Sequence, residues 1–403
     1  KQVVQCGLMD DTMPTTVSTL IAVALAVCAG CAPDDGPWIP SFEACEAPVL
    51  APDDLVEFEA GIFTAGGEEF LPHGINSYPL LQHVGNGELE AVRDILGQAG
   101  SLGRRFLRTN AFMDGGDNPA RIRDDDGTIR EEGLAALDLV VAEAAGADVR
   151  LLLLLTNNWE DFGGAQAVVN AAAPGEGLPK DAFWSEPRAV AAQLDYVRTI
   201  ALRTNTVSGR PYAADPSILG WELANEARCD DPDWCAVDAL PSWAAAMSDE
   251  LRDAGARQPI FWGGAGYLGE HGEDLRDIGG DGGVDVLTLH LYLHHSHPYL
   301  ENLPASQRIS EAVDIGAGII RERAAVADEA GLPLVIEELG WRPPAGADRD
   351  AERAAIFEGW LAVAHHEGLA TMPWMIGETG REDFDGLLIR PTDELTWAVL
   401  SCR

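Results

Sequence analysis

The stretch that decides the fold covers residues 218–228 and reads Ile-Leu-Gly-Trp-Glu-Leu-Ala-Asn-Glu-Ala-Arg. It begins as a short apolar run behind the turn residues at 215–216, which predicts a buried strand. It ends on an amide, a carboxylate and a guanidinium, at Asn225, Glu226 and Arg228. The sequence therefore predicts chemistry at the C-terminal end of this strand.

A second apolar segment of the same kind covers residues 333–340 and finishes on Glu337 and Glu338. Two apolar strands that each end in Glu would bring two carboxyl groups to one rim of a parallel sheet. Retaining glycoside hydrolysis needs such a pair, because one carboxyl group protonates the leaving oxygen while the other attacks the sugar. The alternative is that each Glu is a solvated residue at a strand end, since exposed carboxylates greatly outnumber catalytic ones.

Strand-like and helix-like patterns alternate from about residue 56 to residue 403. The strands are predicted near residues 70–78, 104–112, 149–158, 218–226, 258–264, 284–292, 333–340 and 370–377. Between them lie amphipathic helical stretches, such as 133–147, 187–204, 242–254, 310–330 and 350–368. Because the strands are apolar on both faces, the pattern predicts an α/β protein with one catalytic (β/α)8 TIM barrel domain over residues 56–403. An open doubly wound sheet is the alternative, but no Gly-x-Gly-x-x-Gly follows the first strand.

The composition narrows the range of partners. The chain has 403 residues, of which 46% are hydrophobic and 23% charged, an ordinary globular composition. Its 27 basic and 66 acidic residues leave a net charge of −39. A surface this negative repels nucleic acid, so we expect no nucleic-acid partner, and we expect a monomer. The acidic surface suits a salty medium, although a base-composition bias towards Arg would explain the scarcity of Lys equally well.

Residues 1–31 have the pattern of an export leader, with an apolar run after Met13 that is too short for a lasting membrane span. The end of this run is similar to a bacterial lipobox, in which Cys31 would be lipidated and would tether the protein to a membrane. Cys28 departs from the usual Leu, and cleavage without lipidation is the alternative. In both cases we expect the mature protein to be extracellular or at the cell surface. Residues 32–55, rich in Pro, Asp and Glu, predict a tether.

Four cysteines remain if the leader is removed, which is an even number in an oxidising compartment. Cys229 and Cys235 are close enough in sequence to form a disulfide across the loop after Glu226. Cys45 and Cys402 would then join the two ends of the domain. Four free buried thiols are the alternative, whereas a zinc site is disfavoured because the mature part has no Cys-x-x-Cys spacing.

In a barrel of this kind the active site lies at the C-terminal ends of the strands. The residues predicted there are Asn76, Tyr78, Arg108, Asn110, Asn157, Asn158, Trp159, Asn225, Glu226, Arg228, His290, Tyr292, Glu338 and Trp374. Amides, aromatic rings and two carboxylates are typical of a site that binds sugars.

Together these motifs resemble glycoside hydrolase family 5, and within it the endo-β-1,4-mannanases. The motifs are Trp-Glu-Leu-Ala-Asn-Glu-Ala-Arg at 221–228, Asn-Asn-Trp-Glu-Asp-Phe-Gly-Gly at 157–164, His-Leu-Tyr at 290–292 and Glu-Glu-Leu-Gly at 337–340. The resemblance covers roughly residues 56–403. It implies a retaining hydrolase of β-1,4-mannan that uses no cofactor, with Glu226 as acid/base and Glu338 as nucleophile.

The reaction chemistry requires the same two roles, one acid/base and one nucleophile. An acid that keeps its proton near neutral pH needs a raised pKa, so we expect partial burial or a nearby carboxylate to raise the pKa of Glu226. The nucleophile must stay ionised and needs hydrogen-bond donors, which Arg108 and Tyr292 would supply to Glu338. His290 would orient or tune Glu226.

Other residues would contact the sugar. Asn225 would hold the 2-hydroxyl, in a contact that tightens in the transition state. Trp374 is expected to form an aromatic floor and Trp159 a further wall, with Arg228 bordering the leaving-group side. We also expect Tyr78, Asn110 and Asn158 to bind substrate. Glu337 is excluded, because it should point to the opposite side of its strand from Glu338.

Three departures from the family leave the substrate open. Ala227 and Leu293 stand where Pro is common, and Asn110 stands where related mannanases often have Trp. A β-1,4-glucanase on the same scaffold is therefore an alternative. A non-catalytic surface lipoprotein that binds glycans is another, although the presence of both Glu226 and Glu338 argues against it.

Two further clusters could suggest metal ions. His294, His295 and His297 are interpreted as exposed loop residues, since retaining hydrolysis needs no metal. Residues 124–127, Asp-Asp-Asp-Gly, lack the ligand spacing of a calcium loop and are interpreted as a solvated turn. We therefore expect no metal site.

Overall fold

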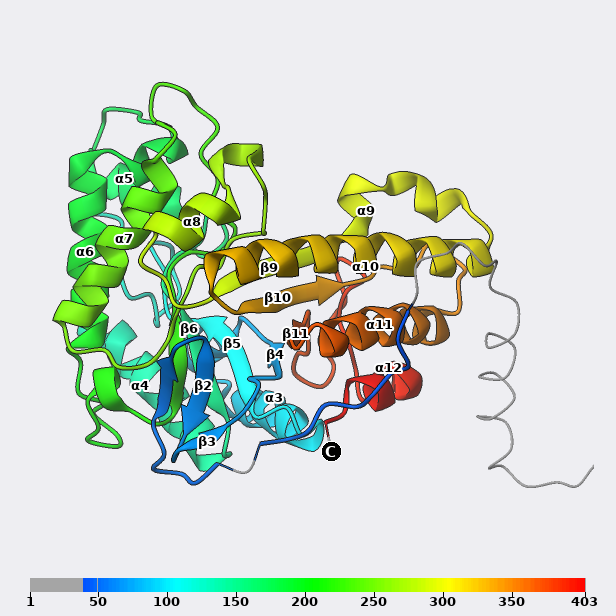
Figure 1. Cartoon of the computed structure of the whole chain (residues 1–403). Helices are drawn as coiled ribbons and strands as arrows, with labels where there is room; N and C mark the ends of the chain where they lie inside the picture. Colours follow the sequence, from blue (N-terminus) through cyan, green and yellow to red (C-terminus); the bar gives the residue numbers. More distant parts are fainter. Residues whose placement is uncertain (1–38, 49, 403) are drawn as a thin grey trace, which may run out of the picture. The chain divides into compact units, whose positions relative to one another are not determined.

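The computed structural model describes residues 39–48 and 50–402. In this part of the chain eight parallel strands follow one another around a barrel, with helices outside them (Figure 1). They are β4 (Gly74–Asn76), β5 (Phe106–Asn110), β6 (Arg150–Leu154), β7 (Ile218–Glu222), β8 (Ile260–Phe261), β9 (Leu287–Tyr292), β10 (Leu334–Gly340) and β11 (Ala370–Pro373). Each strand lies inside one of the segments predicted as a strand.

The barrel is closed by two contacts between its two sheets. Strands β4 to β8 pair in sequence order, and β9 to β11 form the second sheet. A parallel bridge between Phe261 and Val286 joins β8 to the residue just before β9. The amide of Ile376 donates to the carbonyl of Asn76 over 3.0 Å and joins the end of β11 to β4. The predicted (β/α)8 barrel is confirmed.

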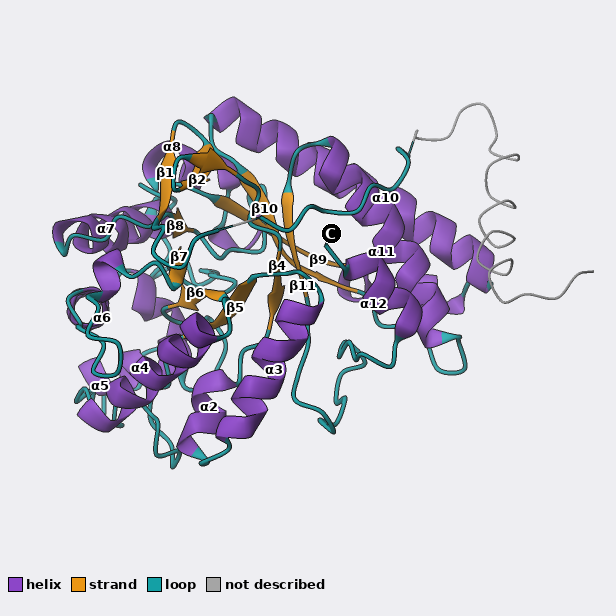
Figure 2. Ribbon diagram, turned by 90° about the horizontal axis from the view of Figure 1, so that it is seen from below, coloured by secondary structure: helices purple, strands orange, loops and turns teal. Residues whose placement is uncertain are grey.

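The helices surround the strands, as the view in Figure 2 shows. They are α2 (Leu80–Gly85), α3 (Leu89–Ser101), α4 (Glu131–Gly146), α5 (Gly164–Ala172), α6 (Pro187–Ala201), α7 (Ala239–Asp253), α8 (Leu275–Asp281), α9 (Leu293–Ser296), α10 (Ala305–Ala330), α11 (Arg349–His366) and α12 (Glu394–Leu400). The amphipathic pattern explains their placement: in α3 the buried Val92, Ile95, Leu96 and Ala99 recur every three or four residues. In the part of the chain that can be placed, no helix combines the length and hydropathy that crossing a bilayer requires.

A small antiparallel sheet closes the end of the barrel where the strands begin. It consists of β1 (Val56–Glu59), β2 (Ile62–Ala65) and β3 (Glu68–Glu69), and it was not predicted. Its buried Val56, Phe63 and Ala65 pack against barrel side chains, among them Phe106, Leu152, Leu219, Phe261, Val335 and Ala370. This end of the barrel is therefore filled by apolar side chains.

The described part of the segment expected to be a tether, residues 39–48 and 50–55, lies against the barrel. Cys45 forms the predicted disulfide with Cys402. Arg150 of β6 donates to the carbonyls of Ala51 and Asp54, over 2.9 and 2.5 Å. The leader at 1–31, with Cys31, and residues 32–38 lie outside the described residues.

Candidate active site

A cleft of about 1540 Å³ lies at the end of the barrel where the strands finish. Every residue predicted for the site lines it except Asn158. Asn158 is buried and accepts a hydrogen bond from Nζ of Lys180 over 2.7 Å, while its neighbour Asn157 reaches the cleft. The two carboxylates, the donors and the aromatic rings expected for a sugar site therefore share one cavity.

The two carboxylates predicted to be catalytic face each other. Glu226 follows β7 and Glu338 lies in β10. One oxygen of each and a ring nitrogen of His290 all lie within 4.8 Å of one another. Retaining glycosidases have carboxyl groups about 5–5.5 Å apart, whereas inversion needs about 6.5–9.5 Å to admit a water molecule. The geometry fits retention.

Glu338 accepts from both donors that the sequence predicted. Nη1 of Arg108 donates to its Oε1, and the hydroxyl of Tyr292 donates to its Oε2 over 2.6 Å. Burial, followed by the charge of Glu338, raises the pKa of Tyr292 well above its usual value, so the phenol keeps its proton. An ionised carboxylate is the form that can accept from both groups, which is the state a nucleophile requires.

Arg108 is the hub of the buried polar groups under the cleft. Its Nε and Nη2 donate to the two oxygens of Glu222, each over 2.6 Å, and Nη2 also donates to Oδ1 of Asn225 over 2.7 Å. Burial alone would lower the pKa of Arg108, but the carboxylates around it, with Glu222 first, raise that pKa well above its ordinary value. Arg108 therefore stays charged and fixes Asn225 and Glu338 relative to each other.

Glu222 is a site residue that the sequence analysis missed. It is completely buried at the end of β7, four residues before Glu226. Burial, partly offset by Arg108, raises the pKa of Glu222 to about 7. A carboxylate inside an apolar strand was the available signal, because a buried charge requires a partner.

Glu226 has a left-handed backbone, with φ of +48°. For a residue with a side chain this conformation costs about 1–2 kcal/mol. The amide of Glu226 donates to the carbonyl of Gly263 over 2.8 Å. A Cβ on Gly263 would lie only 2.4 Å from the carbonyl oxygen of Ala224 and 2.6 Å from Oε1 of Glu222. Gly263 thus lets the chain after β8 approach β7 closely enough to hold Glu226.

The raised pKa expected for Glu226 is wrong. Burial does raise it, but the hydrogen bond and charge of His290, the indole of Trp159 and the charge of Arg228 together lower the pKa of Glu226 to about 2. Nδ1 of His290 lies 3.1 Å from Oε1, and the indole nitrogen of Trp159 donates to Oε2 over 2.8 Å. In this state Glu226 is ionised.

The proton lies instead on His290. Burial would lower the pKa of His290, but the carboxylates of Glu338, Glu226 and Glu337 raise it to about 10. The predicted contact between His290 and Glu226 is confirmed. His290 and Glu226 therefore share one titratable proton. In the stable form this proton lies on His290, which is an imidazolium, and Glu226 is a carboxylate.

Glu337 does not line the cleft, but the prediction that it points to the opposite side from Glu338 is wrong. Pairing between β10 and β9 shifts register between Ile336 and Glu338, which marks a β-bulge at Glu337. The bulge breaks the alternation of sides, so Glu337 and Glu338 both reach the buried polar groups. Oε2 of Glu337 lies 3.4 Å from Nε2 of His290 and 3.9 Å from Nε of Arg108.

Trp159 does more than form the predicted wall, because it also donates to Glu226. Its ring is 40% exposed in the cleft. The guanidinium carbon of Arg228 lies 4.8 Å from the centre of this ring and 5.4 Å from that of Tyr267, whose hydroxyl accepts from Arg228 over 3.1 Å. Tyr267, which the sequence analysis did not single out, thus completes an aromatic and cationic surface beside Glu226.

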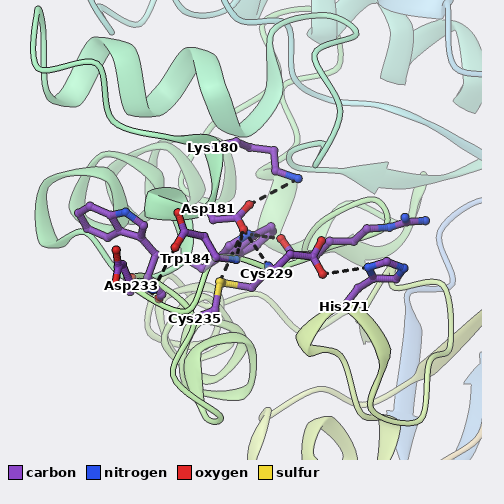
Figure 3. Close-up of a disulfide and its surroundings, with 12 residues drawn as sticks. Lys180, Asp181, Trp184, Cys229, Asp233, Cys235 and His271 are labelled. Carbon is purple, nitrogen blue, oxygen red and sulfur yellow. Dashed lines mark hydrogen bonds and ion pairs between the residues drawn. A yellow bond between two sulfur atoms is a disulfide. The ribbon is translucent and has the colours of Figure 1, made fainter.

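The predicted disulfide between Cys229 and Cys235 is confirmed, and Figure 3 shows the groups around it. The indole of Trp184 donates to the carbonyl of Arg228 over 2.8 Å. Oδ2 of Asp181 accepts from the amides of Asp230 and Asp231, each over 2.8 Å. This loop is therefore anchored where it begins, and it fixes the backbone of Arg228 next to Glu226.

Trp374 lies in the cleft directly after β11. Its ring stacks on that of Tyr78, with centroids 5.9 Å apart and an angle of 19°. The hydroxyl of Tyr78 accepts from Arg381, whose guanidinium carbon lies 5.1 Å from the Tyr78 ring. Asn110 is buried at the cleft wall. Tyr78 and Trp374 thus form a stacked aromatic pair that lines the cleft.

Comparison with known proteins identifies the family of the chain. The family model described as glycoside hydrolase family 5, β-mannosidase-like, matches residues 53–357. A putative mannan endo-1,4-β-mannosidase 9 of Oryza sativa is 27% identical over 92% of this chain and 90% of its own. The rice putative mannan endo-1,4-β-mannosidase 5 is 31% identical over 81% and 70%.

The fold also matches solved structures. An endo-1,4-β-mannanase from Rhizomucor miehei superposes with a TM-score of 0.72, at 24% identity, over 86% of this chain and 98% of its own. At that identity the match supports the barrel fold alone. With the family model matched over most of the described residues, the chain belongs to glycoside hydrolase family 5, in the β-mannosidase-like group.

Proposed function

We propose that this protein is a retaining, endo-acting hydrolase of β-1,4-mannosidic bonds in mannan-type polysaccharides. The observation that carries the proposal is the pair Glu226 and Glu338, with oxygens within 4.8 Å, facing each other across the cleft. The names of the matched relatives support mannan as substrate and attack within the chain.

In the first step Glu338 attacks the anomeric carbon while Glu226 gives a proton to the leaving oxygen, which produces a covalent glycosyl-enzyme. In the second step Glu226 removes a proton from water, which releases the sugar with its original configuration. Arg108 and Tyr292 hold Glu338 in line for the attack. The sugar product leaves with the β configuration.

Other cleft residues are assigned to binding. Nδ2 of Asn225 donates to Oδ1 of Asn157 over 3.0 Å, which leaves its second N–H for the sugar 2-hydroxyl. Trp374 supplies the face of an aromatic ring beneath the reacting sugar. Trp159 and Arg228 border the leaving group, because both lie beside Glu226.

We also propose that the protein works outside the cytoplasm as a monomer. Two disulfides support an oxidising compartment. A tether through lipidated Cys31 remains part of the proposal, and mass spectrometry of the protein from its own membrane fraction tests it.

The experiment that tests the function compares hydrolysis of linear β-1,4-mannan and of cellulose by the purified protein. We expect release of mannan oligosaccharides of several lengths, and proton NMR during the first minutes should show the β anomer. Faster cleavage of cellulose would favour the β-1,4-glucanase, binding of either polymer without cleavage would favour the non-catalytic alternative, and initial α anomer would contradict retention.

Azide separates the roles of the two carboxylates. In Glu226→Ala, azide attacks the glycosyl-enzyme without base assistance and yields a β-glycosyl azide. In Glu338→Ala, azide takes the place of the nucleophile and yields an α-glycosyl azide. The opposite assignment of products would reverse the proposed roles.

A further inference from the structure

We propose that Glu337 is a positioning residue that holds the second N–H of His290, so that His290 stores the acid proton of the reaction and passes it to Glu226. This inference rests on the proposed role of Glu226 as acid/base. It concerns where that proton resides before the leaving group departs.

Glu337 is placed to do this by the bulge in β10. Its side chain is 0% exposed, and its Oε2 faces Nε2 of His290 at 3.4 Å. Its backbone carbonyl accepts from Nδ2 of Asn76 over 2.8 Å, which holds the bulge in place. Within the described residues its Oε1 has no hydrogen-bond partner. The imidazole is thus closer to this carboxylate than the guanidinium of Arg108, which lies 3.9 Å from Oε2 of Glu337.

His290 has carboxylates around it from β7 and the segment after it, from β10, and from the segment that follows β8. Its Nδ1 faces Glu226 after β7 at 3.1 Å and Glu338 of β10 at 3.6 Å. Its Nε2 faces Glu337, and Glu222 and Glu273 act on it from further away. Arg108 of β5 contacts Glu222 and Glu338 of this group, and the charge of Arg228 acts on Glu226.

The charges favour an imidazolium. Glu222, Glu226, Glu337 and Glu338 are buried or nearly so, and Arg108, together with Arg228 beside Glu226, offsets only part of their charge. A neutral His290 would leave the rest of that negative charge out of contact with water, which is costly. The pKa of His290, raised to about 10, agrees with the geometry.

The proton then moves along contacts that already exist. In the first step Nδ1 of His290 gives its proton to the ionised Glu226, and Glu226 passes this same proton to the leaving oxygen as the glycosidic bond breaks. His290 becomes neutral and keeps its proton on Nε2, opposite Glu337. At the same time Glu338 loses its negative charge on forming the glycosyl ester. This loss weakens the electrostatic attraction that keeps the proton on His290.

The second step reverses this transfer. Glu226 takes a proton from the attacking water, the hydroxide oxygen bonds to the anomeric carbon, and the ester bond to Glu338 breaks. As the charge of Glu338 returns, the proton goes back from Glu226 to Nδ1 of His290. The site ends with the protons it began with.

The test is the pH dependence of kcat/KM for mannan oligosaccharides in Glu337→Gln, with Glu222→Gln as the matched control. Glutamine keeps the size and the acceptor of Glu337 but removes its charge, so we expect the alkaline limb to move to lower pH by about one unit. Glu222 is equally buried and contacts Arg108 instead of His290. We expect less than half that shift in the control.

A measurement that needs no activity accompanies it. The ¹⁵N shifts of the His290 ring, assigned against His290→Gln, should show both nitrogens protonated at pH 8 in the wild-type protein. In Glu337→Gln the titration of the ring should move down with the alkaline limb. If Glu337→Gln does not fold, Glu337→Asp, which withdraws the carboxylate from Nε2, should move both in the same direction by less.

The outcomes separate the two proposals. A neutral His290 at pH 8, or equal pH profiles and equal ring titrations in Glu337→Gln and wild type, would overturn the inference while leaving the hydrolase intact. A wild-type protein that cleaves no β-glycan would overturn the proposed function. The ring titration would then still decide where the proton of the His290–Glu226 pair lies.

Discussion

The two ends of the barrel differ in the side chains that they bury: one end is apolar and the other is charged. The end where the strands begin is closed by Phe63 and its neighbours from β1 and β2, packed against apolar side chains of the barrel. The end where the strands finish holds Arg108 and His290 among buried carboxylates. Burying apolar surface stabilises the fold, whereas burying charges costs free energy that their mutual contacts only partly return. Stability and chemistry are therefore separated along the barrel axis.

The largest expected effect is at the charged end. Glu338→Gln should lower kcat on mannan oligosaccharides by about 10⁴-fold or more, because the nucleophile is lost. The melting temperature should stay the same or rise, because one of several crowded buried negative charges is removed. Steady-state kinetics and thermal unfolding check both. A variant that keeps even a hundredth of wild-type activity would contradict the role of Glu338 as nucleophile. A variant that unfolds at room temperature would show that the charged end also supports the fold.

The second effect is at the apolar end. Phe63→Ala should lower the free energy of unfolding by about 3–5 kcal/mol, because Phe63 is buried against Phe261 and Phe58. The value of kcat per folded molecule should change by less than about twofold. Ile62→Ala is the matched control, since Ile62 precedes Phe63 in β2 but is 41% exposed. Urea denaturation measures both variants, and equal losses in the two would contradict the comparison.

The third effect concerns pH. Glu273 is completely buried, accepts from the indole of Trp262 over 2.9 Å, and its burial raises its pKa from 4.5 to about 7. Folding therefore takes up a proton here between these two pH values. The resulting stabilisation is complete below pH 4.5 and is lost as pH rises through 7.

Glu273→Gln should remove this dependence, which amounts to about 3 kcal/mol across that range. Urea denaturation at several pH values measures it. Glu270→Gln, which changes an exposed carboxylate three residues away, should keep the wild-type slope. Parallel curves for wild type and Glu273→Gln would mean that Glu273 is ionised in the folded protein.

The smallest effect tests how tightly the charged end is packed. A Cβ on Gly340 would lie 2.3 Å from Cε1 of Tyr292, so Gly340→Ala should displace the ring that donates to Glu338. We expect kcat to fall about tenfold. In Gly318→Ala, on an exposed part of α10 with no atom within 4 Å of the new Cβ, kcat should not change. Equal kcat in both variants would show that the Tyr292 contact is dispensable.

Much of the fold could be predicted because each barrel strand is a short apolar run bounded by turn residues. Most of the predicted cleft residues could be found from the C-terminal ends of the predicted strands, because parallel strands place their last residues at one rim of the barrel. The sheet β1–β3 was missed because its strands are short and carry charged residues, as in Val-Glu-Phe-Glu at 56–59. Its role depends on the contact between Phe63 of β2 and Phe261 of β8, two residues far apart in the sequence.

The errors in the site have local causes. Glu337 was excluded because alternation of sides holds for a regular strand, and nothing in the sequence of β10 marks the bulge. The pKa of Glu226 was expected to be raised because burial was weighed without the positions of His290 and Trp159. Both errors concern which side chains lie next to each other at the ends of the strands, and that depends on the pairing of strands far apart in the chain.

The positions of the cysteines determine the order in which the two disulfides can form during synthesis. Cys402 follows β11, so its bridge to Cys45 must wait until every barrel strand has been synthesised. Cys229 and Cys235 become available when synthesis has gone only just past β7. During that interval Cys45 can pair wrongly with either of them, and correction then depends on thiol–disulfide exchange. A host that supplies a disulfide isomerase should therefore give a higher yield of correctly bridged protein than one that supplies only an oxidant.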